Sequence, residues 1–296
     1  MTNKIHIPVS VCSDYEGYNF FANLHNKLQK LQFEHVVFDF SRNTWFEANL
    51  CAVLGAIINQ AGTWFNQVTM EGLAPKQQDI FSRNHFLASL GGQKILDYND
   101  TTIKYRRNKL ADDKLIKEFL YSELINKHDF PKLSNAARNE IIRSIFEIYS
   151  NAIIHGDCTE VFSCGQFYPR KAPPRIDFTI VDIGRTIKSN VSDYLKKDVP
   201  GIDAIRWALQ ENNTTKPKEK NIPGGLGLKI ICDFVRLNNG KVQIVSSNGY
   251  WQLANGHEET RTINAPFPGT LVNLEFNLDD QSFYYLKEET PEEIIF

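Results

Sequence analysis

The stretch NEIIRSIFEIYSNAIIHG, residues 139–156, constrains the fold most, because its hydrophobic residues follow the period of a helix. The apolar positions recur at intervals of three and four, which predicts an amphipathic helix. They are Ile141, Ile142, Ile145, Ile148, Tyr149, Ala152 and Ile153. The intervening polar residues form one stripe along the helix. They are Glu140, Ser144, Glu147, Asn151 and His155, and Ser134 is the expected N-cap.

A polar stripe is usually a solvated surface, but two features of this one favour a functional role. Glu147 and Asn151 stand four residues apart, and the stripe ends at His155-Gly156, where the helix should stop. Asn is also a mediocre helix former, so Asn151 in mid-helix favours a specific role. A carboxylate beside an amide oxygen can position a water molecule and hold Mg²⁺.

Composition restricts the class of protein. A chain of 296 residues, 42% hydrophobic and 23% charged, suits an ordinary globular protein with one large domain or two. The net charge is −2 with both signs interspersed, so a nucleic acid or an anionic membrane is not indicated as a partner. The first residues have no apolar signal-peptide core, and no apolar stretch has membrane-spanning length, so the expected location is cytoplasmic.

The five cysteines include no CxxC pair. They are expected to be free thiols in a reducing cytoplasm. A zinc site of His155, Cys158 and Cys164 would lack a fourth ligand and is disfavoured.

Strand and helix patterns alternate over the first hundred residues, which predicts a small α/β domain. The expected strands are 4–11, 35–40 and 67–70, and the expected helices are 17–31, 49–61 and 75–90.

This order resembles a STAS domain, the fold of bacterial anti-sigma-factor antagonists, over about residues 4–92. The resemblance rests on Asp39–Ser41, Trp45–Asn49 and Leu54-Gly55. Antagonists of that family carry a phosphorylated serine at the tip, whereas Glu47–Leu50 here contains no hydroxyl group. The resemblance therefore implies that the phospho-switch is absent. A different small α/β docking domain remains the alternative.

The rest of the chain also alternates between strand and helix patterns. The expected strands are 101–106, 159–166, 175–182, 241–246 and 270–278, and the expected helices are 114–125, 139–156, 190–195, 201–210 and 228–237. Residues 248–269 are long, polar and expected to be irregular. Residues 212–223 contain two prolines and several lysines and are expected to form a loop.

Four short motifs occur in a fixed order on these elements. They are Glu147 with Asn151 on the helix, Asp182-Ile183-Gly184 after a strand, Gly224-Gly225-Leu226-Gly227 before a helix, and Gly269-Thr270 before the last strand. The glycine-rich turn is neither a Walker P-loop, because no Gly-Lys-Ser/Thr follows, nor a Rossmann fingerprint. Its N–H groups and the helix dipole would suit a phosphate.

The ordered set closely resembles the GHKL ATPase family of gyrases, heat-shock chaperones, histidine kinases and mismatch-repair ATPases, over about residues 110–280. The resemblance implies a two-layer α/β sandwich of the GHKL (Bergerat) type that binds ATP with Mg²⁺. Asp182 would then accept a hydrogen bond from the adenine amino group, Gly184 would let the backbone approach the base, and Thr270 would support the base pocket.

The resemblance assigns the phosphate end to the other motifs. Asn151 would coordinate Mg²⁺, the turn Gly224-Gly225-Leu226-Gly227 would face the phosphates beside a lid formed by residues 212–223, and Glu147 would be the general base for water. The chain departs from the family at Arg185-Thr186, where a second glycine is usual. Arg185 is thus a candidate contact for a phosphate or a partner. Lys216, Lys218 and Lys220 in the lid are further candidate phosphate contacts, although the lysines of a charge-rich loop are usually solvated.

The predicted organisation is a STAS-like α/β domain at 1–105 and a GHKL ATP-binding domain at 106–296. The predicted function is a slow Mg²⁺-dependent ATPase that acts as a nucleotide-driven switch on a protein partner. Homodimerisation on ATP binding is an expectation from the resemblance alone. The alternatives are an anti-sigma-factor-type serine/threonine kinase acting on another chain, and a nucleotide sensor without catalysis. A complete histidine kinase is disfavoured because no His-containing dimerisation hairpin precedes the module.

Overall fold

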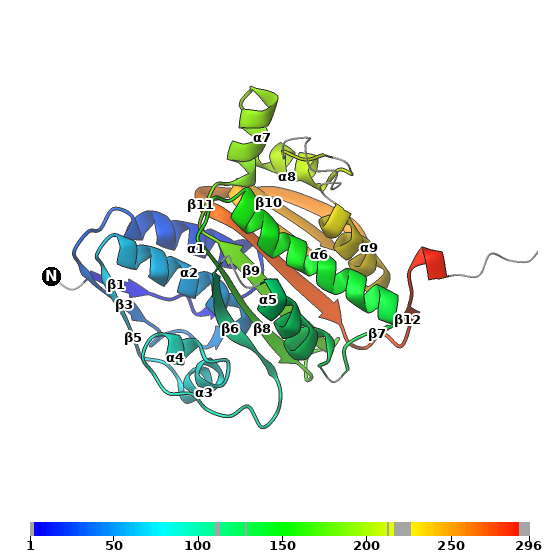
Figure 1. The fold of residues 1–296 in the computed structure, drawn as a ribbon. Coiled ribbons are helices and arrows are strands. Elements are labelled where there is room, and N and C mark those ends of the chain that lie inside the picture. Colours follow the sequence, from blue (N-terminus) through cyan, green and yellow to red (C-terminus); the bar gives the residue numbers. More distant parts are fainter. Residues whose placement is uncertain (1–2, 110–112, 128, 212, 216–225, 290–296) are drawn as a thin grey trace, which may run out of the picture.

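A computed structural model describes residues 3–109, 113–127, 129–211, 213–215 and 226–289. The protein is a mixed α/β structure with several sheets (Figure 1), so the predicted α/β class is confirmed. Among the described residues, no helix has both the length and the apolar character to cross a membrane.

The N-terminal unit, residues 3–89, contains a small parallel sheet in the order β1-β3-β5. Helices connect its strands, as the alternating pattern predicted. The elements are β1 (Asn3–His6), α1 (Tyr15–Leu28), β3 (His35–Asp39), α2 (Cys51–Thr63), β5 (Gln67–Glu71), α3 (Pro75–Arg83) and α4 (Phe86–Ser89). The predicted helix over 75–90 is interrupted at His85, whose φ of 66° is incompatible with a continuing α-helix.

A five-stranded antiparallel sheet forms the centre of the molecule, in the order β10-β11-β9-β8-β6. The strands are β6 (Thr102–Lys109), β8 (Glu160–Tyr168), β9 (Arg175–Asp182), β10 (Lys241–Ala254) and β11 (His257–Asn277). The predicted domain boundary between residues 105 and 106 falls inside β6, the edge strand of this sheet.

Helices cover one face of the central sheet (Figure 1). They are α5 (Asp113–Phe119), continued by the π-helical η2 (Leu120–Ile125), α6 (Asn135–Ile154) and α9 (Leu226–Asn238). The predicted N-cap is confirmed, since the Ser134 side chain accepts a hydrogen bond from the Ala137 N–H at 3.0 Å. Ile145 and Ile148 of α6 share a core with Ile180 and Val272 of the sheet. Ser144 is buried, so it does not belong to a solvated stripe.

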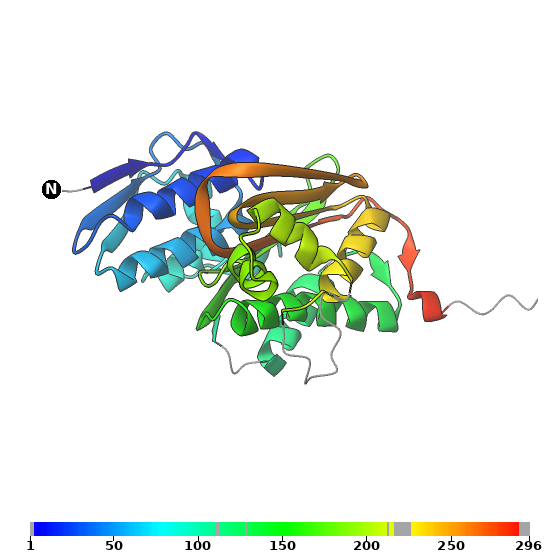
Figure 2. The same cartoon turned by 90° about the horizontal axis from the view of Figure 1, so that it is seen from above.

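The N-terminal unit covers the opposite face, as the view from above shows (Figure 2). Phe21 of α1 and Leu54 of α2 belong to the same hydrophobic core as Val181 of β9 and Leu271 of β11. The two parts of the chain therefore pack against each other through a shared hydrophobic core.

The prediction that residues 248–269 are irregular is wrong. They form most of the long β10–β11 hairpin, which turns at Asn255-Gly256. Tyr250 and Ile263 from this hairpin are buried in the core shared with the N-terminal unit. Their partners come from residues far away in sequence, so the local pattern did not reveal the strands.

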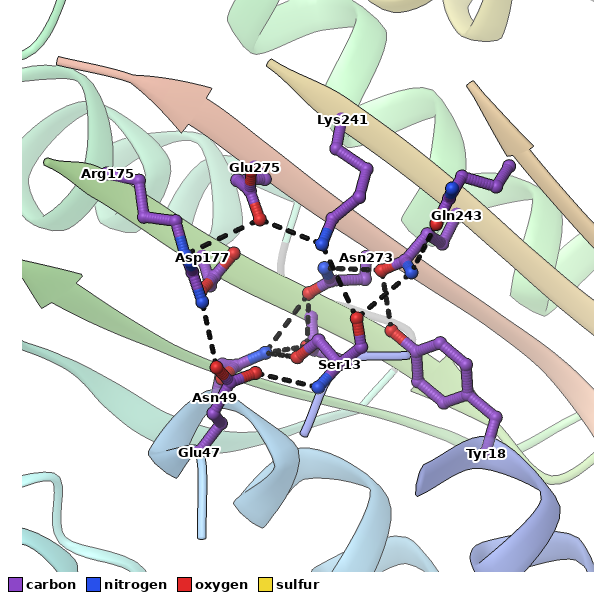
Figure 3. A network of polar contacts seen from close by, with 12 residues as sticks. Ser13, Tyr18, Glu47, Asn49, Arg175, Asp177, Lys241, Gln243, Asn273 and Glu275 are labelled. Carbon is purple, nitrogen blue, oxygen red and sulfur yellow. Dashed lines mark hydrogen bonds and ion pairs between the residues drawn. The ribbon is translucent and has the colours of Figure 1, made fainter. Parts of the chain in front are cut away.

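A network of polar side chains, here called the polar seam, lies inside this shared interface (Figure 3). Asn49 donates from Nδ2 to Ser13 Oγ, Thr179 Oγ1 and Asn273 Oδ1, at 2.8, 2.9 and 3.1 Å. The members of the seam are Ser13, Tyr18, Glu47, Asn49, Arg175, Asp177, Thr179, Lys241, Gln243, Asn273 and Glu275. Of the polar residues on alternate positions of β9, Asp177 and Thr179 are thus buried against the N-terminal unit, and Arg175 is partly buried.

The remaining elements are short or lie beside the central sheet. Helices α7 (Ile187–Leu195) and α8 (Gly201–Leu209) form a small cluster next to β10 and β11 (Figure 1). The other short elements are β2 (Ser10–Val11), β4 (Trp45–Phe46), η1 (Ala48–Leu50), β7 (Lys132–Leu133), β12 (Phe283–Tyr284) and η3 (Lys287–Glu289).

Candidate functional site

A cavity lies between α6, the ends of β9 and β11, and the α7–α8 pair. Asn151 of α6, Asp182 of β9 and Thr270 of β11 all line it, so three residues predicted from separate motifs meet at one place. Its volume of about 120 Å³ is well above the roughly 10–15 Å³ that one water molecule needs. Apolar side chains supply much of the remaining wall, among them Ile148 and Ile180.

Asp182 is the chemically most distinctive residue of the cavity. It is buried at the last position of β9, where Thr270 pairs with it across the sheet. Within the described structure, its Oδ1 atom has no hydrogen-bond partner. Burial raises the pKa of its carboxyl group to about 8, against the opposing effect of the Thr270 and Gly184 N–H groups. A buried acceptor without a donor is costly, and a ligand donor would relieve it.

Glycines let the backbone close around Asp182. A Cβ atom on Gly184 would lie 2.1 Å from the carbonyl oxygen of Gly156 and 3.1 Å from Asp182 Oδ1. Gly269 has φ of 124°, and a Cβ there would lie 2.3 Å from the Asp182 carbonyl oxygen. These close approaches require glycine, because a side chain at either position would push the backbone segments apart.

The opposite wall of the cavity is formed by residues that the sequence motifs did not identify as ligand contacts. The residues of α7 and α8 in this wall belong to no predicted motif. Trp207 of α8 and Asn190 of α7 line the cavity, with His155 and Thr215 beside them. His155 Nδ1 lies 3.0 Å from Thr215 Oγ1, and the Asn190 side chain donates to the His155 carbonyl oxygen at 2.7 Å. No sequence signal marks Trp207, because an aromatic residue in an amphipathic helix normally indicates packing.

Arg185, the departure from the family pattern, also lines the cavity. Its guanidinium group forms an ion pair with Asp193 of α7. The side chain is about half exposed, so it lies at the edge of the cavity rather than within its buried part.

Glu147 lies one helical turn before Asn151 on α6, outside the set of cavity-lining residues. Its Oε2 atom accepts a hydrogen bond of 3.1 Å from the N–H of Gly227, at the start of α9. A Cβ on Gly227 would lie 2.5 Å from that oxygen, so glycine permits the contact. A carboxylate here also suits the positive end of the helix dipole.

The structure describes only some of the remaining motif residues. Leu226 is the first residue of α9, whereas Gly224 and Gly225 lie outside the described residues. Of the expected lid, only 213–215 are described, and they line the cavity. In the described ranges, no three His, Cys, Asp or Glu side chains gather as metal ligands.

No protein-family model matches the sequence, and the search of curated proteins finds no significant match. The interpretation of the cavity therefore rests on its own residues and geometry.

Proposed function

We propose that the cavity binds the adenine base of ATP and that the protein belongs to the GHKL type of ATP-binding proteins. The observation that carries the proposal is Asp182, a buried carboxyl group whose Oδ1 lacks a partner among the described residues and which lines an apolar cavity. The exocyclic amino group of adenine is a donor that would satisfy it. The flat base would lie against apolar walls such as Ile180 and Val272.

The phosphates would extend from the base pocket toward Asn151 and the start of α9. A helix N-terminus favours anions, because its first N–H groups have no partner within the helix. The Asn151 carboxamide would hold Mg²⁺, which usually takes few protein ligands and binds the phosphates as well. The metal ion would supply charge neutralisation at the phosphates.

Glu147 supports slow hydrolysis as the reaction. It stands four residues from Asn151 on the same face of α6 and could orient and deprotonate a water molecule. In the described structure it is bound to the Gly227 N–H, so it would have to exchange this partner for water when nucleotide binds. We propose that ATP then acts as a switch on a protein partner, with the N-terminal unit as a STAS-like module.

Calorimetric titration of the full chain tests the base pocket. ATP should bind in the presence of Mg²⁺, and GTP should bind at least tenfold more weakly, because guanine has a carbonyl acceptor where adenine has its amino group. Equal affinity for the two nucleotides would contradict the role of Asp182, and no binding of either would contradict the proposed function.

Phosphate release from the wild type and Glu147→Gln tests the reaction. The variant should keep ATP binding and lose turnover by roughly 100-fold or more, the scale of general-base catalysis. Equal turnover in the two proteins would contradict the role of Glu147 as the general base. Binding without turnover in either would leave a nucleotide sensor.

A further inference from the structure

The polar seam between the N-terminal unit and the central sheet contains an unequal number of acids and bases (Figure 3). Three carboxyl groups, those of Glu47, Asp177 and Glu275, face two cations, those of Arg175 and Lys241. If all five groups were ionised, one negative charge would remain unmatched in a largely buried interface. An unmatched buried charge is strongly destabilising, and proteins usually avoid it by neutralising one group.

Asp177 is the member of the seam that can carry the neutralising proton. Its side chain is 0% exposed, whereas those of Glu275 and both cations remain about one-fifth exposed. One of its oxygens, Oδ2, accepts from Arg175 Nε at 2.9 Å. The other, Oδ1, has no hydrogen-bond partner in the described part of the chain, so a proton there displaces no existing contact.

The groups around Asp177 also favour its protonated form. Burial, followed by the carboxylates of Glu275 and Glu47, raises the pKa of Asp177 to about 8, and the two cations only partly oppose this. Titratable groups face Asp177 from five other segments as well as from its own strand. They are Glu47, Arg175, Glu275, Lys241 and the phenols of Tyr18 and Tyr168. Both phenols have pKa values raised well above their usual range, chiefly by burial, so they stay neutral.

We propose that the N-terminal unit is held on the central sheet by a seam that contains one proton on Asp177, and that loss of this proton loosens the docking. When the units separate, water reaches Asp177 and its carboxyl group ionises readily. Docking is therefore linked to pH. The strands concerned, β9 and β11, also carry Asp182 and Thr270, so the docked unit buttresses the strands that form the cavity.

The sign of the linkage follows from the two states. The docked state holds the proton up to about pH 8, whereas the separated state loses it near the ordinary value of 3.8. Between these limits separation releases one proton, so its equilibrium constant should rise about tenfold per pH unit. Above about pH 8 Asp177 is ionised in both states, so the equilibrium constant for separation should no longer change with pH.

Two cysteines in the interface provide the measurement. Cys51 of α2 and Cys164 of β8 are fully buried, and both sulfur atoms lie 3.5 Å from the Asn84 side-chain nitrogen. Cys232 of α9 is buried on the opposite face of the sheet and serves as an internal control. The full chain is exposed to a thiol-alkylating reagent between pH 6 and pH 9.5. The labelling rate of each cysteine, found by mass spectrometry, is divided by that of a model thiol at the same pH.

The corrected labelling of Cys51 and Cys164 should rise about tenfold per pH unit up to about pH 8, while that of Cys232 stays constant. Asp177→Asn should abolish the rise, because a neutral amide cannot ionise. Glu275→Gln removes a neighbouring carboxylate and balances the remaining charges, so the rise should level off at lower pH. Asp198→Asn changes an exposed carboxylate outside the seam and should behave as the wild type.

Three results would overturn the proposal. The first is labelling of Cys51 and Cys164 that is independent of pH in the wild type. The second is an unchanged pH dependence in Asp177→Asn or, if that variant does not fold, in Glu275→Gln. The third is a parallel rise for Cys232, which would indicate unfolding of the whole chain instead of separation of the units. None of these results depends on nucleotide binding.

Discussion

Asp182 and Thr270 are paired across strands β9 and β11, and both line the same cavity. The antiparallel backbone pairing of the two strands holds the relative position of these residues. A ligand entering this cavity would meet a preformed acceptor with no need to reorganise the backbone.

Replacing Asp182 by Asn should weaken ATP binding roughly 10- to 100-fold, the scale of one hydrogen bond to a charged group. The change keeps the shape of the side chain and removes its ability to ionise. Calorimetry of both proteins with ATP measures the effect. Asp198→Asn alters an exposed carboxylate and should leave the affinity unchanged. An equal affinity in Asp182→Asn and the wild type would place the base elsewhere.

ATP binding should release a proton from Asp182 below about pH 8. In the ligand-free protein burial raises the pKa of this carboxyl group to about 8, so it is mostly protonated at neutral pH. The adenine amino group favours an ionised acceptor and would lower that pKa. Affinity should therefore increase with pH and level off above about pH 8. Titrations at pH 7 in buffers of different ionisation enthalpy detect the proton, and identical heats in all buffers would contradict its release.

Gly184→Ala should damage both the site and the fold. The added Cβ would lie 2.1 Å from the Gly156 carbonyl oxygen, and forced overpacking costs typically about 1–3 kcal/mol. ATP binding should be lost as the segments around Asp182 move apart. Gly62→Ala is the matched control, because a Cβ there meets nothing within 4 Å in helix α2. That change should raise the free energy of unfolding by up to about 1 kcal/mol. Urea denaturation compares the two, and similar effects would contradict the steric argument.

Part of this structure follows from local sequence patterns. Strand β9 has the predicted bounds, because Ile176, Phe178 and Ile180 alternate and pack under the helices. Helix α6 begins four residues before the predicted segment 139–156 and ends two residues before its end, and it contains the predicted apolar stripe. In the candidate site, Asn151, Asp182 and Thr270 were all named from motifs and meet at one cavity.

The docking of the N-terminal unit and the α8 side of the cavity could not be predicted, because both depend on contacts between distant segments. Arg175, Asp177 and Thr179 alternate with the apolar residues of β9, a pattern that normally indicates a solvated face. Asp177 and Thr179 are buried and Arg175 is partly buried, because the N-terminal unit packs on this face and supplies Glu47 and Asn49 as partners. No local pattern contains that information. Trp207 joins the cavity wall for a similar reason, through the docking of α8 beside the sheet.

Asn49→Ala should destabilise the protein through the polar seam. The Asn49 side chain donates to Ser13, Thr179 and Asn273, so alanine removes one donor from each of these buried oxygen atoms. Asn273 Oδ1 keeps the Thr179 hydroxyl as a donor at 2.8 Å, so the expected cost is that of one unsatisfied group, about 1–3 kcal/mol. Asn59→Ala in the following helix, α2, removes only one long contact of 3.4 Å to Glu160 and should change stability by less than about 0.5 kcal/mol. Urea denaturation of the three proteins gives both differences. If the two variants were equally stable, the seam would specify the docking geometry without stabilising it, because its hydrogen bonds would only replace those that its members make with water.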